Sequence, residues 1–564
     1  MKRIAFFLLL PLLLAAQPVP PGTSGRQRPG SAPQVQPPPT KPEDLCSLEG
    51  QALNAATGEP LGKASLTLRR VDAPPGPPGA ARAYSASSNA SGKFSIVNIE
   101  PGKYRLSATR TGFVNAEFGA RDFLQAGETL SLDAGRKMGD VLFRMTPNAV
   151  VTGKVVDEDR EPMAFLTVQA MRYRYTQGRK QLVSFGSAST NDIGEYRIFG
   201  LPPGRYYISV SPRRSYAQNR SGAGQQAEEE FVPTYYPGTT DPAAAAALDI
   251  GPGVQFRGAD VGLAKRRTVH VKGHVSDRSG SERRRPMVYL IPRVGAAAGN
   301  RPAILDAIGN FDIQGVVAGS YTLVASIQDR GKSLAARMPV EVGNNPVENL
   351  SLTINPALDL SGVVRLDGQV TASVSSVQLT LRPRDPAGLM LGSSYPSAKV
   401  KDDGSFSLSS VNPDNYSVTF SGLPDGFYVK AILTGGQDVL APGLDLSRGV
   451  AGPVDIVLAP NAGQAAGLVQ SDQQQPAAGV TVVLIPQERE RKDQPQYYKT
   501  TTTDTAGSFT FKNLDPGQYK VYAWREVESG AYMDSEFVGP VESRGQALTI
   551  HEGSQENLQL KLIG

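Results

Sequence analysis

The stretch GSFTFKNLDPGQYKVYA, residues 507–523, decides the fold of this chain. On both sides of its centre apolar residues alternate with polar ones, which is the period of a strand with one buried face. At its centre lies Asp515-Pro516-Gly517, where proline presets one turn torsion and glycine tolerates a positive φ. The stretch therefore predicts a strand, a tight turn and a second strand.

The same unit occurs five times with fixed internal spacing. In each copy a glycine is followed two residues later by Phe or Tyr and twelve residues later by Tyr, and the copies recur every 95 to 115 residues. The pairs are Gly92/Tyr104, Gly194/Tyr206, Gly309/Tyr321, Gly404/Tyr416 and Gly507/Tyr519. Copy three has Ala318 in place of the turn proline, and copy four has Asp414 in place of the turn glycine. Five concordant copies indicate an array of similar small domains.

A second landmark, a strand centred on a glycine, precedes each hairpin glycine by 36 to 42 residues. These opening glycines are Gly50, Gly153, Gly273, Gly362 and Gly467. Another apolar strand usually follows, and each copy closes with a strand that runs almost directly into the next opening. About seven short strands in roughly 100 residues, separated by turns, are typical of a β-sandwich. The best helix candidate is one turn at Asp241–Ala247, with Asp as N-cap and Pro at the first helical position.

We therefore predict an all-β protein of five tandem, approximately seven-stranded antiparallel sandwiches. Sandwiches 1 to 5 are expected at residues 45–147, 148–267 (with a long polar loop at 213–230), 268–356, 357–460 and 461–564. The 564 residues suit five domains of ordinary size better than one core. Because few residues separate one sandwich from the next, we expect an elongated particle.

The N-terminus predicts export. Lys2-Arg3, the apolar run Ile4–Leu14 and the small residues after it form the three regions of a secretory signal peptide, at 1–17. Residues 18–44 are rich in proline and predict a disordered tether. No later segment approaches the length of a membrane helix. We expect a secreted or periplasmic protein, or one at the extracellular surface. The single cysteine, Cys46, is expected as a buried thiol or as an intermolecular partner.

Charge and motifs argue against nucleic-acid binding and catalysis. The formal net charge of +5 is small for this length, and its basic clusters lack the aromatic interleaving of a nucleic-acid groove. His270 and His274 lie on one expected strand about 13 Å apart, too far to share a metal. Acidic residues such as Asp402-Asp403 fall in turns, where Asp bonds nearby backbone. We predict no catalytic, metal or cofactor site.

Five aromatic residues outside the repeat pattern are candidates for stacking on sugar rings. They are Tyr235, Tyr236, Tyr497, Tyr498 and Trp524. Trp524 follows a buried position and should face outward unless the loop after it folds over. Interdomain packing and loop anchoring remain the alternatives for these side chains.

The pattern Gly-x-Phe-x-Φ-x-x-Φ-x-Pro-Gly-x-Tyr-x-Φ, with an opening such as Gly50–Ala64, resembles the carboxypeptidase regulatory-like domain. That domain is a transthyretin-like sandwich related to the CnaB-like repeats of Gram-positive adhesins and to the starch-binding-like fold. The match is strongest in copies one, two and five. Tandem copies behind a signal peptide look like exported bacterial proteins.

These expectations lead to a functional hypothesis. The chain is an exported, non-catalytic binding or structural scaffold whose partner is a protein or polysaccharide at the cell envelope. One alternative is a carbohydrate-binding protein using the exposed aromatics of the starch-binding-like fold. A second is a regulatory partner of a separate enzyme.

Overall fold

The computed structural model describes residues 41–564 except 72–82, 121–122, 124–126, 177, 213–227, 281–284, 294–300, 330–331, 386–394 and 505. The predicted signal peptide, most of the predicted tether and most of the predicted polar loop at 213–230 lie outside the described residues. The structure is all-β, with 57% strand and 6% helix, as the sequence predicts. Within the described residues no helix is long and apolar enough to cross a membrane.

Sandwich 1 shows how one repeat is built. Its opening strand β1 (Cys46–Asn54) pairs antiparallel with β4 (Lys93–Ile99) and parallel with β8 (Lys137–Met145). In the facing sheet, β2 (Ser65–Arg70) lies between β3 (Ala83–Ser87) and β5 (Gly102–Thr109). The short strands β6 (Ala116–Glu117) and β7 (Leu130–Leu132) pair with the other edge of β5. The two sheets enclose one apolar core, and Cys46 is buried beside it. Its Sγ donates to the carbonyl of Asp133 at 3.0 Å, so the prediction of a quiet buried thiol is confirmed.

The later repeats use the same order with local additions. The strands of sandwich 2 are β9 (Ala149–Val156), β10 (Thr167–Thr176), β11 (Arg179–Ser189), β12 (Glu195–Leu201), β13 (Gly204–Ser211), β14 (Glu228–Phe231), β15 (Thr234–Tyr235), β16 (Leu248–Ile250), β17 (Gln255–Phe256) and β18 (Val261–Gly262). Those of sandwich 3 are β19 (Lys265–Asp277), β20 (Met287–Pro292), β21 (Arg301–Pro302), β22 (Ile304–Leu305), β23 (Asn310–Val316), β24 (Gly319–Asp329), β25 (Lys332–Val342) and β26 (Val347–Ile354). Sandwich 4 contains β27 (Leu358–Leu366), β28 (Gln378–Pro383), β29 (Ser397–Lys399), β30 (Ser405–Val411), β31 (Asn415–Ser421), β32 (Tyr428–Thr434), β33 (Gln437–Asp438), β34 (Leu444–Asp445) and β35 (Val454–Ala459). Sandwich 5 contains β36 (Gly463–Gln470), β37 (Thr481–Pro486), β38 (Lys499–Thr502), β39 (Ser508–Leu514), β40 (Gly517–Trp524), β41 (Gln546–Ile550) and β42 (Gln555–Ile563). A large buried apolar cluster lies inside each of the five expected ranges.

One feature of the topology corrects the prediction of antiparallel sandwiches. In every repeat the opening strand pairs in parallel with the closing strand, as β1/β8, β9/β18, β19/β26, β27/β35 and β36/β42. A parallel pair needs a long crossover connection. Here the whole second sheet and the hairpin lie between the two strands and supply it.

The opening glycine is explained by what surrounds it. A Cβ built on Gly362 would lie 2.0 Å from the carbonyl oxygen of Val454 on the closing strand and 2.4 Å from the ring of Phe406 on the hairpin. No side chain fits between a strand carbonyl and an aromatic ring at these distances. Gly50, Gly273 and Gly467 each meet a closing-strand carbonyl at 2.1–2.2 Å, and Gly153 meets the carbonyl of Ala259, just before the closing strand, at 2.2 Å.

The repeated tyrosine has a second role beyond its buried ring. In all five copies its hydroxyl donates to the carbonyl four residues earlier, just before the hairpin turn, at 2.6–2.9 Å. The donors are Tyr104, Tyr206, Tyr321, Tyr416 and Tyr519. Because the ring is buried, this bond satisfies a hydroxyl that would otherwise cost free energy. It also ties the turn to the second strand.

The polar turn before each hairpin follows the predicted chemistry. Asp504 accepts from the backbone N–H groups of Ala506 and Ser508 at 2.9 and 2.8 Å. Asn89, Asn191 and Asp306 accept in the same way in sandwiches 1 to 3. The expected helical turn is present as the 3-10 helix η3 (Pro242–Ala244), capped by the side chain of Asp241.

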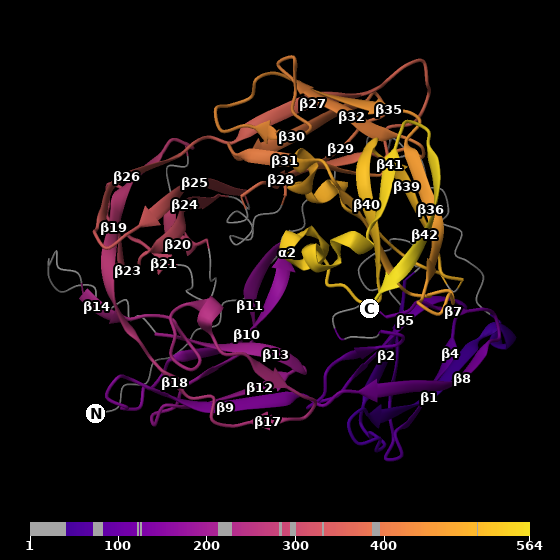
Figure 1. The fold of residues 1–564 in the computed structure, drawn as a ribbon, viewed down its shortest axis with the longest axis horizontal. Helices are drawn as coiled ribbons and strands as arrows, with labels where there is room; N and C mark the ends of the chain where they lie inside the picture. Colours follow the sequence, from indigo (N-terminus) through magenta and orange to yellow (C-terminus); the bar gives the residue numbers. More distant parts are fainter. Residues whose placement is uncertain are drawn as a thin grey trace, which may run out of the picture.

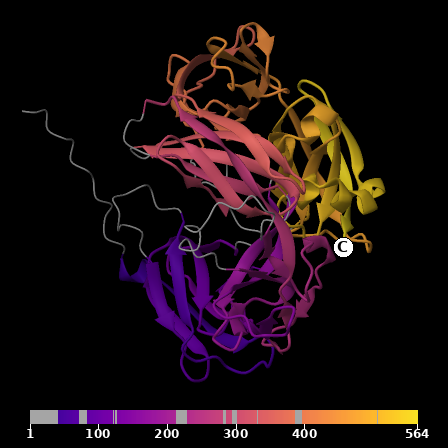
Figure 2. The same ribbon diagram turned by 90° about the vertical axis from the view of Figure 1, so that its left-hand side faces the viewer.

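The sandwiches do not form a rod. Figure 1 shows the coloured chain running around a ring, from sandwich 1 in indigo through magenta and orange to sandwich 5 in yellow. In the side view the orange and yellow parts still lie together above the indigo and purple parts (Figure 2). The expectation of an elongated particle is therefore wrong: short joints fix the angle between neighbours, but they do not require that angle to be straight.

Each joint between consecutive sandwiches has its own contacts. Between sandwiches 1 and 2, the guanidinium of Arg172 lies 5.6 Å from the ring centre of Phe123. Strand β19 begins in sandwich 2, where β14 pairs with it, and continues into sandwich 3. Between sandwiches 3 and 4, Arg337 forms an ion pair with Asp414, the residue that replaces the turn glycine of copy four. Burial raises the pKa of the Asp414 carboxyl, and the charge of Arg337 opposes that rise. Between sandwiches 4 and 5, the Tyr428 hydroxyl donates to Glu552 at 2.7 Å.

Candidate functional site: a cleft where sandwiches 2, 4 and 5 meet

A non-sequential contact closes the ring, and we call it the clasp. The long hairpin of β10 and β11 reaches from sandwich 2 to the segment 525–545 of sandwich 5. Arg174 forms an ion pair with Glu528 at 2.5 Å, and the backbone N–H of Tyr175 donates to the same carboxylate at 3.2 Å. The ring of Tyr175 lies 6.1 Å from that of Phe537, edge to face. The clasp thus joins residues 353 positions apart in the sequence.

The segment 525–545 lies between β40 and β41 of sandwich 5, and we call it the insertion. It contains the 3-10 helices η7 (Ala531–Met533) and η8 (Gly539–Arg544) and the single-turn helix α2 (Ser535–Val538), which Asp534 caps by accepting from the Glu536 N–H. Figure 1 shows α2 beside β11, on the inner side of the ring. These helices are too short to give a helical period in the sequence, so they were not predicted.

The insertion explains where Trp524 lies. Trp524 points away from the main core of sandwich 5, as predicted, but only 4% of it is exposed. It stacks on Tyr522 with ring centroids 5.0 Å apart and packs against Phe537. The insertion folds over Trp524, which is the exception that the sequence left open, so this ring offers no open face to a sugar and its assignment as a glycan contact is wrong.

The other aromatic candidates are also covered to different extents. Tyr235 is 2% exposed in a small cluster with Met171 and Leu182, and burial raises its pKa. Tyr497 is 5% exposed, and burial raises its pKa to about 12. Neither ring offers a free face, so their assignment as glycan contacts is also wrong. Tyr236 and Tyr498 are half-buried, packed against apolar clusters, and their contact with glycans stays a prediction.

A cleft of about 650 Å³ lies where sandwiches 2, 4 and 5 meet. Sandwich 2 contributes Gly178 and Arg179 from the tip of the clasp hairpin, and sandwich 5 contributes Met533 from its insertion. Sandwich 4 contributes four apolar side chains, Phe420, Leu423, Val429 and Leu440, together with Arg382 and Arg384. The polar lining from sandwich 5 includes the helical turn that contains Tyr497. Cavities of this size at domain junctions are common ligand sites.

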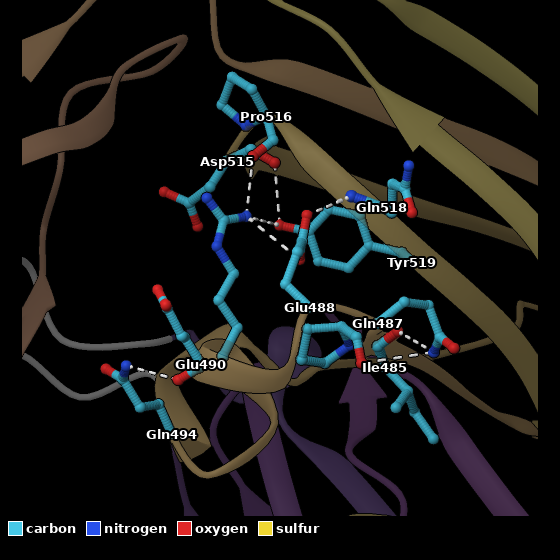
Figure 3. Close-up of polar contacts among 11 residues, drawn as sticks. Ile485, Gln487, Glu488, Glu490, Gln494, Asp515, Pro516, Gln518 and Tyr519 are labelled. Atoms are coloured by element: carbon cyan, nitrogen blue, oxygen red, sulfur yellow. Dashed lines mark hydrogen bonds and ion pairs between the residues drawn. The ribbon is translucent and has the colours of Figure 1, made fainter. Parts of the chain in front are cut away.

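Arg491, on the short helix α1 (Arg489–Lys492), contacts the cleft residue Tyr497, with its guanidinium 4.9 Å from the ring centre. The same guanidinium donates to the carbonyl of Pro516 at 2.8 Å and to the Tyr519 hydroxyl at 3.4 Å. Glu488 accepts from the Gln518 N–H at 2.8 Å (Figure 3). These bonds connect α1 to the hairpin of β39 and β40 in sandwich 5.

Asp515 lies in the same hairpin turn and lines the cleft. Figure 3 shows its carboxylate pointing away from the ring of Tyr519. Burial raises the pKa of Asp515, and the charges of Lys499 and Arg491 oppose that rise. Burial thus disfavours the charged form of this carboxylate, and the two neighbouring cations favour it.

The histidines are engaged in cross-strand contacts. His270 Nδ1 lies 2.9 Å from Asp312, and His274 Nδ1 lies 3.1 Å from Asn310, both across the β19–β23 pair. Across the described part of the chain, no group of three or more His, Cys, Asp or Glu side chains is placed to hold a metal ion.

Comparison with known proteins identifies part of the chain. Residues 47–137 and 464–562 match the carboxypeptidase regulatory-like domain, so the chain contains two such domains, in sandwiches 1 and 5. The matched family is a regulatory-like domain and not a catalytic one. Among curated proteins, none matches the chain.

Solved structures of pilins are similar to parts of the chain. The minor pilin GBS52 of Streptococcus agalactiae has 12% identity and a TM-score of 0.23, covering 39% of this chain and 96% of that one. The major pilin subunit BcpA of Bacillus cereus has 11% identity and a TM-score of 0.14, covering 56% and 100%. The Bacillus anthracis TIE protein has 13% identity and a TM-score of 0.15, covering 75% and 76%. At such low TM-scores we draw no functional conclusion from these likenesses.

Proposed function

We propose that the protein is an exported, non-catalytic scaffold of five tandem sandwiches that serves a binding or structural role at the cell envelope. One observation carries the proposal: the same glycine and tyrosine contacts occur five times, and the junctions between sandwiches have contacts of their own. A chain built in this way holds five surfaces in a fixed mutual arrangement. That is the property a scaffold needs.

The chemistry of the polar residues supports a structural role. The turn carboxylates and amides accept from backbone N–H groups, and Asp414 and Glu528 pair with arginines at contacts between sandwiches. The two matched regulatory-like domains agree with this role. The expected signal peptide at 1–17 supports export.

Cell fractionation and cross-linking test this proposal. We expect the mature protein in the envelope or the medium, with its N-terminus near residue 17, and cross-linked there to one or a few protein or polysaccharide partners. Purified protein should show background rates on peptide, ester and glycoside substrates. A full-length chain confined to the cytoplasm would contradict the export claim. Turnover that is lost on a single Asp, Glu or His substitution would contradict the non-catalytic claim.

A further inference from the structure

The cleft between sandwiches 2, 4 and 5 carries an excess of positive charge. Two carboxylates line it, Asp493 and Asp515, against five cationic side chains: Arg179, Arg382, Arg384, Lys492 and Lys499. Within the described residues, none of these five lies within ion-pair distance of a carboxylate. The lining therefore carries an excess of three positive charges over its two carboxylates.

Arg384 shows how hydrogen bonds can be satisfied while charge remains. Its guanidinium donates to the carbonyls of Ala441 and Pro442 and to the Ser417 hydroxyl. All three acceptors are neutral, so they hold the side chain without neutralising it. Arg382 lies 5.5 Å from the ring centre of Tyr395, another neutral partner. An anion in the cleft would meet a prearranged positive potential.

The apolar part of the lining includes one residue, Phe420, that differs in size from its counterparts in the other sandwiches. Four residues after the hairpin tyrosine, the other sandwiches have Ala108, Val210, Ala325 and Ala523, all buried in their cores. Sandwich 4 has Phe420 there, half-buried and lining the cleft. The larger side chain adds an aromatic ring to the apolar part of the lining. Apolar surface together with a few charged groups is the usual composition of a small-molecule site.

We propose that this cleft binds an amphipathic organic anion, with its apolar body against Phe420 and Leu423 and its anionic group facing Lys499 and Arg382. Because Gly178 and Arg179 of the clasp hairpin and Met533 of the insertion line the cleft, the site is complete only when the clasp is closed. Binding and closure are therefore linked: the anion stabilises the closed ring, and opening the ring weakens binding.

Two fluorescent probes test the charge requirement on the full mature protein. 8-Anilinonaphthalene-1-sulfonate carries an aromatic body and a sulfonate, and N-phenyl-1-naphthylamine is a neutral compound with the same type of body. The double variant Arg382→Gln/Lys499→Gln should weaken sulfonate binding on the order of tenfold, since two partly screened charge contacts are lost. It should leave binding of the neutral probe nearly unchanged. The matched control Lys93→Gln/Lys137→Gln, at exposed positions of sandwich 1, should change neither.

Two further variants test the rest of the site. Phe420→Ser should weaken both probes, because it removes apolar surface that both use. Glu528→Arg should also weaken both, because it opens the clasp and takes Arg179 and Met533 away from the cleft. Unfolding midpoints are measured for every variant. If Phe420→Ser fails to fold, the double variant Arg382→Gln/Lys499→Gln decides the proposal, because neither of the side chains it replaces takes part in an ion pair among the described residues. Equal sulfonate affinity in the cleft double variant and its control, or equal affinity of both probes at every salt concentration, would overturn the proposal.

Discussion

The inside of the sandwiches and the contacts between them follow different rules. Inside, one opening glycine and one hairpin tyrosine make the same contacts five times. Between sandwiches, no two junctions are alike: the Arg337–Asp414 pair at the joint of sandwiches 3 and 4 is 12% and 20% exposed, whereas the Arg174–Glu528 pair of the clasp is 29% and 31% exposed. The interiors hold each sandwich together, and the junctions determine the shape of the ring.

The covalent chain makes the two kinds of junction unequal. At a consecutive joint the neighbours are already tethered by a few residues, so their contacts only select an angle. The clasp must hold together parts that are separated by more than three hundred residues, and it opposes the entropy of closing that loop. Damage to an interior should therefore cost most in stability, and damage to the clasp should cost least but change the shape.

The largest loss is expected from Gly362→Val in the interior of sandwich 4. A Cβ there would overlap the carbonyl of Val454 and the ring of Phe406, and neither the backbone nor the packed ring can move away freely. We expect sandwich 4 to lose more than about 3 kcal/mol. Hydrogen exchange read by mass spectrometry over 357–460 measures this in the full chain. Gly343→Val, where a Cβ meets nothing within 4 Å, is the control and should leave the exchange of its own sandwich nearly unchanged.

A smaller loss is expected from Asp414→Ala at the joint of sandwiches 3 and 4. The substitution leaves Arg337 largely buried without its carboxylate, which should cost about 2 kcal/mol because a little solvent still reaches the pair. Urea unfolding followed together with hydrogen exchange of β25 and β31 measures it. The matched control Asp249→Ala breaks an exposed ion pair with Arg205 and should not change the unfolding midpoint measurably. An equal effect of both substitutions would show that the buried ion pair at this joint stabilises the protein no more than the exposed one.

A loss of about 1 kcal/mol is expected from Tyr416→Phe, since one buried hydrogen bond to the carbonyl of Asn412 disappears while the ring stays in place. The corresponding change at Tyr104 should cost a similar amount in sandwich 1. Unfolding of each sandwich in the full chain, resolved by hydrogen exchange, makes the comparison. A loss of stability at only one of the two tyrosines would mean that the same hydrogen-bond geometry contributes differently to stability in different sandwiches.

The sequence predicted the repeat because the repeat is local. Alternation, turn residues and the fixed distance from glycine to tyrosine all lie within a few strands, so the hairpins, the buried Cys46 and the capped turn at Asp241 could be predicted. The reason for the opening glycine could not, because it requires the closing strand to arrive in parallel about ninety residues later.

The cleft and the clasp were missed for a similar reason. Glu528 looks like any charged residue in a polar segment, and only its distance to Arg174 gives it a role. One signal was available: Asp414 and Phe420 both break the repeat pattern, and Asp414 pairs with sandwich 3 while Phe420 lines the cleft at the edge of its own core.

The smallest loss of stability, with the largest change of shape, is expected from Glu528→Arg in the clasp. The arginine would face Arg174 with a like charge and remove the acceptor of the Tyr175 N–H, and we expect the aromatic contact of Tyr175 with Phe537 to be too weak to keep the clasp closed by itself. Because the pair is about one-third exposed, we expect a cost of about 1 kcal/mol or less, and each sandwich should unfold as before. Small-angle scattering should nevertheless show a larger radius of gyration, since no consecutive joint brings sandwich 5 to sandwich 2. Asp249→Ala, which removes an ion pair from the same sandwich as Arg174 but away from the clasp, should leave the scattering curve unchanged. If the scattering of Glu528→Arg matches that of the wild type, the consecutive joints alone hold the ring closed, and the distinction between joints and clasp fails.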